Sequence, residues 1–494
     1  MIQIKQKTLV REATLPVSNG VNHWLSRRHW RYIRSLVYML QASEYNIVDF
    51  LKWHERVKDF RHIEKRKHLM FTPKTIILFT LGWIALLATL GCAAFAFYHV
   101  ASPWNYLLSA LLVFEAPLIV MVSLLFFVVC IRFVQYPVEQ FLIARTRKRL
   151  SAHRGIKIAI AGSFGKTSMR EILKTVLSEG RKVAAPGESY NTPLGIARFV
   201  KELQSDEDVL IFELGEYYPG DVRKLTQMIR PEWGIVTGVN EAHLEKFGML
   251  EKTADTIFEL AESVGASRLY VNGESELARA RSKNGNILYT RAGAGEWQVE
   301  NPTTDLLGIT FTLLKDDVSM NVRSGVCGLH IPGPLSVAAD IASRLGLTNH
   351  EISDGIAKTK PFAHRLEPKQ WPDDITFIDD SYNGNSDGAR AAIEFLASLQ
   401  GRRFYVTPGL VEAGTRVMEV HESIGRKLAE AHIEKVVLIR NSVTPHIESG
   451  LRAASFKGEI LWYDDMQFCL SALRSLTTPG DIVLIQNDWP DQYA

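Results

Sequence analysis

Cysteine is scarce in this chain, and the few cysteines lie far apart in the sequence. The 494 residues include only Cys92, Cys130, Cys327 and Cys469, with no CxxC pair. Disulfide frameworks and zinc sites need closely spaced cysteines, so neither is expected. Charged residues make up 22% of the chain against 46% hydrophobic, which is too apolar for a disordered chain but charged enough for a soluble catalytic portion. The length allows two to three domains.

Charged residues are missing altogether from one long stretch. Residues 75–114 contain no Asp, Glu, Lys or Arg, and after Glu115 the uncharged run continues to Ile131. Helices over residues 75–98 and 105–131 would each exceed a hydrocarbon thickness of ~30 Å, at ~1.5 Å per residue. A cleavable signal is excluded because a long polar segment comes first. We therefore predict a two-span membrane hairpin, with a buried hairpin of a soluble protein as the alternative.

Positive charge is concentrated in the N-terminal third. Residues 1–157 hold 22 Lys and Arg against 8 Asp and Glu, a net charge of +14, which leaves −11 for the remainder. Both outer flanks of the hairpin are basic and its turn carries no formal charge, so both ends are expected in the cytoplasm. The basic stretches 27–34 and 145–154 favour anionic lipid headgroups over nucleic acid. Glu115 is either a functional intramembrane carboxylate or an interfacial one.

A glycine loop follows the basic stretch. Residues 156–161 predict a strand, and residues 169–177 predict a helix. Between them lie the candidate phosphate-binding residues Gly162, Ser163, Gly165, Lys166, Thr167 and Ser168. Backbone N–H groups at a helix start bind phosphate, the lysine adds charge, and a hydroxyl can join the Mg²⁺ shell. The glycine that usually opens such a loop is replaced by Ile160, so an ordinary strand-to-helix turn is the alternative.

Two later strands end in candidate metal ligands. Residues 208–213 form an apolar run that ends in Glu213, and residues 233–240 form another that is followed by His243. Parallel α/β sheets bind ligands at the carboxyl ends of their strands. Glu213 is therefore placed to bind a metal ion, and His243 is a functional candidate, although a lone histidine can also be structural.

Five motifs resemble the Mur ligase family, most closely its MurF type, which joins D-alanyl-D-alanine to UDP-N-acetylmuramoyl-tripeptide. In the family's order they are residues 162–168, 189–195, 212–215, 240–245 and 379–385. The similarity runs from about residue 155 to residue 494. It implies an α/β fold with a P-loop central domain and a Rossmann-like C-terminal domain, preceded here by the α-helical two-span membrane segment.

The resemblance also implies a reaction and its residues. In this family ATP phosphorylates a carboxylate, and an amine then displaces phosphate from the acyl phosphate, with Mg²⁺ assisting. By resemblance the catalytic residues are Lys166, Glu213, His243 and Arg365, and Thr167, Glu213 and His243 hold Mg²⁺. Asp380, Tyr382 and Asn383 contact ATP from the C-terminal domain, and Asn191 and Thr192 face the substrate. For residues 379–385, a polar turn that caps the following helix is an alternative or additional role.

Three departures separate this chain from the family pattern. The lysine that is carbamylated in the family and bridges Mg²⁺ is replaced by Ile257, so Asp255 or Glu259 would have to substitute, or the second metal is lost. The family's C-terminal Lys-Gly-Ser stretch is replaced by residues 484–491, which leaves the incoming amine open. The N-terminal domain that grips the UDP-sugar has no counterpart, because the hairpin occupies that stretch.

These observations predict the domain organisation and a function. We expect a basic cytoplasmic helical segment (1–74), a transmembrane hairpin (75–131), a basic juxtamembrane linker (132–154), a central ATP-binding domain (155–360) and a C-terminal domain (361–494). Alternation over residues 301–331 predicts paired strands in a small inserted sheet.

The predicted protein is an ATP-dependent amide ligase of bacterial cell-wall or envelope synthesis, anchored in the inner membrane with its catalytic domains in the cytoplasm. Its expected partners are a carboxylate-bearing envelope precursor, which the anchor would allow to be lipid-linked, and an amino acid or dipeptide. The alternative is an ATP-binding scaffold with reduced catalysis.

Overall fold

The computed structural model describes residues 25–57, 59–63, 68–187, 190–242, 244–382, 384–411 and 413–487. The chain forms two compact units, which divide between Val138 and Glu139. The predicted residues His243 and Asn383 lie outside the described residues.

The first unit is helical. It contains α2 (Tyr32–Ala42), α3 (Ile47–Arg56), a 3₁₀ turn (Phe60–His62), α4 (Pro73–His99) and the first part of α5 (Trp104–Ala152). Thr72 and Thr75 form a capping box at the start of α4, with Pro73 at its first position, which explains why the helix begins there. Apolar side chains of α2 and α3 pack with Leu78 of α4 and Leu124 of α5 in one cluster.

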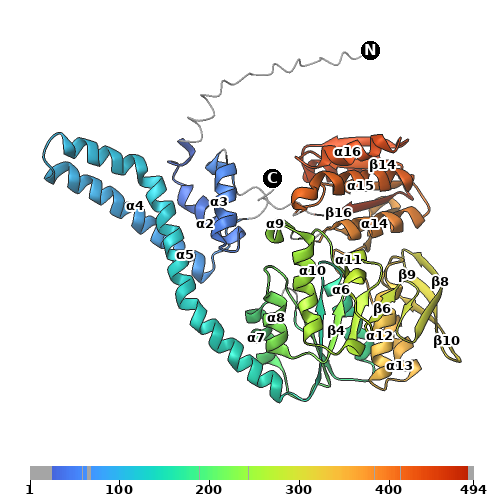
Figure 1. Ribbon diagram of the computed structural model, residues 1–494. Coiled ribbons are helices and arrows are strands. Elements are labelled where there is room, and N and C mark those ends of the chain that lie inside the picture. The colour runs from blue at the N-terminus through green and yellow to red at the C-terminus, as the bar shows by residue number, and fades with distance from the viewer. Residues whose placement is uncertain are drawn as a thin grey trace, which may run out of the picture. The chain divides into compact units, whose positions relative to one another are not determined.

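Helices α4 and α5 run side by side in this unit (Figure 1). The Ser109 hydroxyl on α5 donates to the Ala93 carbonyl on α4 at 2.8 Å. Both helices are long and apolar enough to cross a membrane, and only 22% and 17% of their most apolar windows is buried within the protein. The stretch predicted as a juxtamembrane linker is helical, since α5 continues to Ala152.

The second unit contains two α/β domains. The first α/β domain is built on a ten-stranded sheet in the order β10-β9-β8-β7-β6-β5-β4-β1-β3-β2. Strands β1 to β6 pair in parallel. Strands β7 to β10 extend the same sheet as antiparallel neighbours. The strand pairing predicted within residues 301–331 is therefore confirmed, but these strands continue the main sheet through β7 and form no separate one.

The elements of this domain are β1 (Ile156–Ala161), α6 (Lys166–Leu177), β2 (Val183–Ala184), α7 (Pro193–Glu202), β3 (Val209–Glu213), α8 (Asp221–Ile229), β4 (Trp233–Val236), α9 (Leu244–Phe247), α10 (Leu250–Phe258), β5 (Leu269–Asn272), α11 (Glu276–Arg281), β6 (Ile287–Thr290), β7 (Gly293–Ala294), β8 (Trp297–Asp305), β9 (Gly308–Lys315), β10 (Val318–Ser324), α12 (Pro332–Arg344) and α13 (Asn349–Ala357). Strands β1 and β3 are almost wholly buried, which fits a parallel sheet covered on both faces.

The second α/β domain has a six-stranded sheet in the order β11-β12-β16-β13-β14-β15, in which only β11 is antiparallel. Its elements are β11 (Glu367–Trp371), β12 (Ile375–Asp380), α14 (Ser386–Ser398), β13 (Arg403–Thr407), α15 (Val417–Glu430), β14 (Lys435–Ile439), α16 (Thr444–Ala453), β15 (Glu459–Tyr463), α17 (Met466–Leu476) and β16 (Ile482–Gln486). Apolar clusters on the two faces of the sheet bury the strands, as in Rossmann-like domains.

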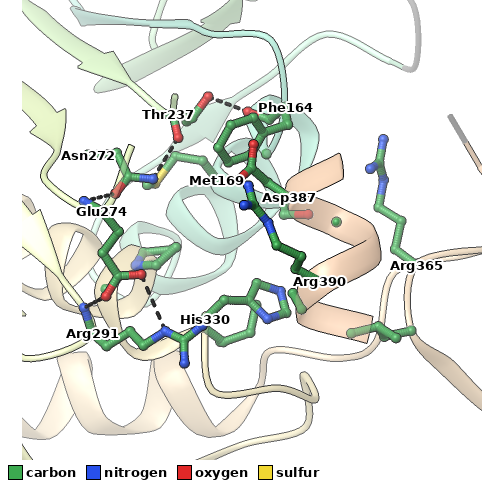
Figure 2. A pocket seen from close by; sticks show the side chains of 18 of the residues that line it. Phe164, Met169, Thr237, Asn272, Glu274, Arg291, His330, Arg365, Asp387 and Arg390 are labelled. Atoms are coloured by element: carbon green, nitrogen blue, oxygen red, sulfur yellow. Dashed lines mark hydrogen bonds and ion pairs between the residues drawn. The ribbon is translucent and has the colours of Figure 1, made fainter. Parts of the chain in front are cut away.

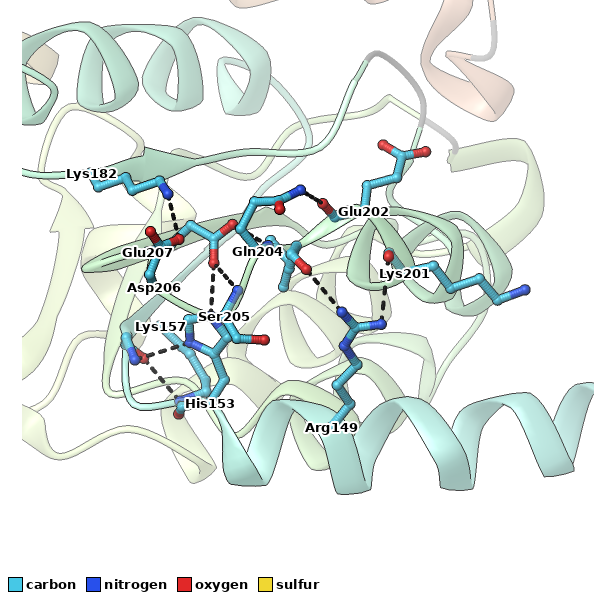
Figure 3. A network of polar contacts seen from close by, with 12 residues as sticks. Arg149, His153, Lys157, Lys182, Lys201, Glu202, Gln204, Ser205, Asp206 and Glu207 are labelled. Carbon is cyan, nitrogen blue, oxygen red and sulfur yellow. Dashed lines mark hydrogen bonds and ion pairs between the residues drawn. The ribbon is translucent and has the colours of Figure 1, made fainter.

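The last turns of α5 belong to the first α/β domain. Ile143 and Leu150 are 5% and 0% exposed and sit in the apolar cluster of that domain. Arg149 donates to the Leu203 carbonyl at the end of α7 at 2.8 Å. His153 Nε2 lies 3.0 Å from a carboxylate oxygen of Glu207 (Figure 3). The folded core of the first α/β domain therefore starts well before β1.

Candidate active site

The phosphate loop connects β1 to α6 through two glycines in conformations that favour glycine. Gly162 has φ +146°, and a Cβ there would lie 2.2 Å from Thr237 Oγ1. Gly165 has φ +74° and precedes α6, and no described side chain caps the helix at that residue. The first N–H groups of α6 therefore have no capping side chain, which is the arrangement that binds phosphate.

Lys166, the first residue of α6, reaches back over the loop. Its ammonium donates to the Gly162 carbonyl and to Glu216 Oε1, the latter at 2.7 Å. The Lys166 side chain is 14% exposed and that of Glu216 only 1%. A positive charge is therefore fixed beside the helix start, where a nucleotide phosphate would bind.

The residues predicted to hold Mg²⁺ fit an oxygen-binding cation as far as the structure describes them. The Thr167 hydroxyl lies 3.3 Å from Glu213 Oε2, at the carboxyl end of β3. Hydroxyl and carboxylate oxygens are the donors that Mg²⁺ prefers. Arg170 Nη1 lies 2.9 Å from the other Glu213 oxygen and offsets its charge. The third predicted ligand, His243, is outside the described residues and stays a prediction.

A cavity of about 530 Å³ opens from the phosphate loop and is lined by both α/β domains (Figure 2). The first domain contributes the loop itself and the ends of β4, β5 and β6; the second contributes α14 and the turn before β11. Lining residues include Phe164, Gly165, Ser168, Thr237, Asn272, Glu274, Arg291, His330, Arg365, Asp380, Asp387, Arg390 and Glu394. Its volume suits a nucleotide-sized ligand.

Two polar contacts join the domains around this cavity. Arg291, after β6, makes a bidentate ion pair with Glu394 on α14 at 2.7 and 2.8 Å. The Asn240 amide donates to Asn385 at 3.0 Å and to Asp387 at 2.8 Å. Asn385 also caps α14, which confirms the capping role predicted for the 379–385 turn. The same residue lines the cavity. We call the Arg291–Glu394 pair the domain clasp.

Two predicted residues of the second domain line this cavity, and a third lies beside one of them. Arg365 and Asp380 both line it. The Arg365 guanidinium lies 4.9 Å from the centre of the Tyr382 ring, which is 41% exposed. Asp380 ends β12 and accepts hydrogen bonds from the Leu366 N–H at 3.1 Å and the Gln486 amide at 3.3 Å.

Asp380 should make the stability of the protein depend on pH. Burial raises the pKa of its carboxyl to about 7, against the opposing effects of the Gln486 and Leu366 hydrogen bonds and the Arg365 charge. Between about pH 4 and pH 7 the folded state then holds a proton that the unfolded state releases, so the free energy of unfolding falls as pH rises. We expect Asp380→Asn to make the free energy of unfolding depend less on pH in this range.

The measurement is the thermal unfolding midpoint of the full chain in detergent at pH 5, 6, 7 and 8. Asp373→Asn, at an exposed position in the turn before β12, is the matched control and should keep the slope. An unchanged slope in Asp380→Asn would show that this carboxyl does not titrate in that range.

Of the two predicted substrate residues, Asn191 contacts the loop that follows β3, and Thr192 begins α7. The Asn191 carbonyl accepts from the Gly215 N–H at 2.9 Å, two residues after Glu213. Thr192 caps α7 by accepting from the Gly195 N–H at 3.3 Å. Thr192 thus has a structural role, and contact of either residue with substrate stays a prediction.

The residue that stands in place of the family's carbamylated lysine is buried. Ile257 is fully buried in the apolar core. Asp255 pairs with Arg281 at 3.1 Å, and Glu259 accepts from the Arg223 N–H at 2.8 Å. Both acids thus have partners on neighbouring elements.

Sequence reasoning missed Glu216 and His330. Burial, with the Arg291 charge nearby, lowers the pKa of His330 to about 4, so its ring is neutral. Its Nδ1 is buried with no hydrogen-bond partner among the described residues, and the ring lines the cavity. Glu216 stands three residues after Glu213, a spacing that could have drawn attention to it. No local signal marks His330.

Comparison with protein families matches two successive parts of the chain. Residues 160–332 match the family described as the Mur ligase middle domain, and residues 364–486 match the Mur ligase glutamate ligase domain. Together they cover more than half of the chain.

Named relatives and solved structures agree with these matches. The UDP-N-acetylmuramoyl-tripeptide–D-alanyl-D-alanine ligase of Mycobacterium tuberculosis H37Rv is 29% identical over 354 residues, covering 67% of this chain and 69% of that protein. The Escherichia coli K12 enzyme of the same name is 26% identical over 288 residues, covering 57% and 64%. MurF from Acinetobacter baumannii has a TM-score of 0.63 at 21% identity, covering 71% of this chain and 77% of that one. MurF from Thermotoga maritima, solved in complex with ADP, has a TM-score of 0.61 at 22% identity, covering 71% and 80%. With its phosphate loop, its two α/β domains in this order and both family matches, this chain belongs to the Mur ligases, a family of ATP-dependent ligases.

Proposed function

We propose that this protein is a membrane-anchored MurF-type ligase that forms an amide bond in peptidoglycan synthesis at the expense of ATP. The observation that carries the proposal is the uncapped start of α6, with Lys166 beside it, opening onto a cavity that both α/β domains line. The names of the relatives supply the substrate class: a UDP-N-acetylmuramoyl-tripeptide and D-alanyl-D-alanine.

The proposed reaction has two steps. A carboxylate oxygen of the precursor attacks the γ-phosphorus of ATP, the bond from that phosphorus to the bridging oxygen breaks, and ADP leaves. The amine then attacks the acyl carbon, phosphate leaves with the electrons of the carbon–oxygen bond, and the nitrogen loses a proton.

The residues would act mainly by positioning and by neutralising charge. Lys166 and the first N–H groups of α6 would bind the phosphates, and Arg365 would approach them from the second domain. Thr167 and Glu213, with His243, would hold Mg²⁺, which would supply further positive charge to the phosphate oxygens. Asp380 and Tyr382, with Asn383, would line the nucleotide site on the second domain.

We further propose that α4 and α5 anchor the chain in the bacterial inner membrane. Their length, apolar surfaces and basic flanks support this, and the basic flanks favour cytoplasmic catalytic domains. The first family match begins at residue 160, so recognition of the precursor need not follow the family's UDP-sugar domain. An anchor would raise the effective concentration of a lipid-linked carboxylate.

The test uses the full chain purified from washed membranes and reconstituted in lipid. It is given ATP, Mg²⁺ and D-alanyl-D-alanine with either soluble UDP-N-acetylmuramoyl-tripeptide or its lipid-linked form. Release of phosphate and a product heavier by the dipeptide minus water would support the ligase, and hydroxylamine should trap the acyl phosphate. If the protein prefers the soluble precursor, the proposal of a lipid-linked substrate is wrong. ATP binding without any turnover would favour the scaffold.

A further inference from the structure

A second buried carboxylate lies at the phosphate loop. Glu216 is only 2% exposed, and its Oε1 accepts from the Lys166 ammonium at 2.7 Å. Its other oxygen, Oε2, is buried with no hydrogen-bond partner among the described residues. Buried carboxylate oxygens are normally satisfied, so this free oxygen suggests that a ligand supplies the missing contact.

The loop that carries Glu216 is held from both sides. The Gly215 N–H donates to the Asn191 carbonyl at 2.9 Å. The N–H groups of Tyr217 and Tyr218 donate to Asp221 at 3.2 and 2.8 Å. With its neighbours fixed in this way, Glu216 cannot easily swing out to water and stays beside Lys166.

Nucleotide binding would change the charge balance at this point. In the structure described here, Lys166 neutralises Glu216, and Arg170 neutralises Glu213. The phosphates of ATP would draw the Lys166 ammonium toward themselves and leave the buried Glu216 carboxylate without its partner. An unpaired buried charge is strongly unfavourable, so a cation that enters with the nucleotide would restore the balance.

We propose that Glu216 is a protein ligand of the divalent cation that accompanies ATP, in addition to Thr167 and Glu213. This inference rests on the proposed use of ATP. Carboxylates are preferred ligands of Mg²⁺ and Mn²⁺. The proposed ligands thus include two carboxylates, Glu213 at the end of β3 and the buried Glu216 three residues later.

The experiment measures metal binding without catalysis. The full chain in lipid is titrated with Mn²⁺ in the presence of a non-hydrolysable ATP analogue, and free Mn²⁺ is counted by electron paramagnetic resonance. Glu216→Gln keeps the size of the side chain and removes its charge. We expect it to raise the Kd for Mn²⁺ at least tenfold, while binding of the analogue without metal is unchanged or tighter because a negative charge is lost.

Two further variants sharpen the result. Glu216→Asp keeps the charge on a shorter side chain and should bind Mn²⁺ with intermediate affinity. Glu171→Gln removes the same charge from α6 at a carboxylate that is 31% exposed and pairs with Arg170, so it should bind Mn²⁺ like the parent protein. Thermal unfolding shows whether each variant folds. If Glu216→Gln does not fold, Mn²⁺ binding by Glu216→Asp is compared with that of the parent protein.

The outcomes separate this inference from the proposed function. If the parent protein binds neither the analogue nor Mn²⁺, the proposed ATP site itself is wrong. If the parent binds both, and Glu216→Gln binds Mn²⁺ as tightly as the parent does, the metal-ligand proposal is overturned whatever the change in analogue binding, and Glu216 only holds Lys166.

Discussion

Lys166→Ala is expected to lower turnover by about 1,000-fold or more, the scale on which single charged or hydrogen-bonding groups stabilise such transition states. The ammonium of Lys166 lies beside the start of α6, and alanine removes this positive charge from the proposed phosphate site. Phosphate release by the reconstituted protein measures the loss. Lys174→Ala, on an exposed turn of the same helix, should retain activity.

Loss of the Glu216 ion pair could also destabilise the loop, so the unfolding midpoint of Lys166→Ala must be measured with its activity. A double variant with Glu216→Gln removes both charges and should recover stability without recovering turnover. Near-normal turnover in a folded Lys166→Ala protein would exclude the proposed phosphate site.

Removal of the end of α5 is expected to unfold the ligase core. A fragment that starts at residue 155 lacks Ile143 and Leu150, which the first α/β domain buries. A fragment that starts at Glu139, where the second compact unit begins, keeps both. We expect the longer fragment to be soluble and cooperative in thermal unfolding, and the shorter one to aggregate or to unfold at a much lower temperature.

A point substitution tests the same packing in the full chain. Leu150→Ala should lower the free energy of unfolding by about 2–5 kcal/mol, as is usual for a leucine removed from a core. Phe141→Ala, at a side chain that is 65% exposed, should change it by about 0.5 kcal/mol or less. Equal stability of the two fragments, or of Leu150→Ala and the parent, would show that α5 is dispensable to the core.

The elements of the site that depend on local pattern could be predicted from the sequence. The strand, glycine loop and helix around Lys166 follow from residue order alone, and so does Glu213 at the end of an apolar strand. The replacement of the usual first glycine also has a simple explanation. Ile160 is fully buried within β1, in register with Glu213, so this position is extended strand and needs no glycine.

Contacts between distant residues could not be predicted in this way. Lys166 and Glu216 are 50 positions apart, and the pairing of Arg291 with Glu394 spans 103. Which residues pair depends on the order of strands in the sheet and on how the second domain packs against the first. Hydrophobic periodicity carries no information about either. The end of α5 was missed for a related reason, since a basic stretch conceals the two apolar residues that the core buries.

The domain clasp has a consequence for how the ligase exchanges its nucleotide. The side chains of Arg291 and Glu394 are 38% and 35% exposed, so dissolved ions can screen their attraction. The amide contacts of Asn240 with α14 depend less on such screening, because the amide carries no formal charge. We therefore expect higher salt to weaken the clasp more than the Asn240 contacts, so that separation of the two domains, and with it exchange of the proposed nucleotide, would depend on the ionic strength around the protein.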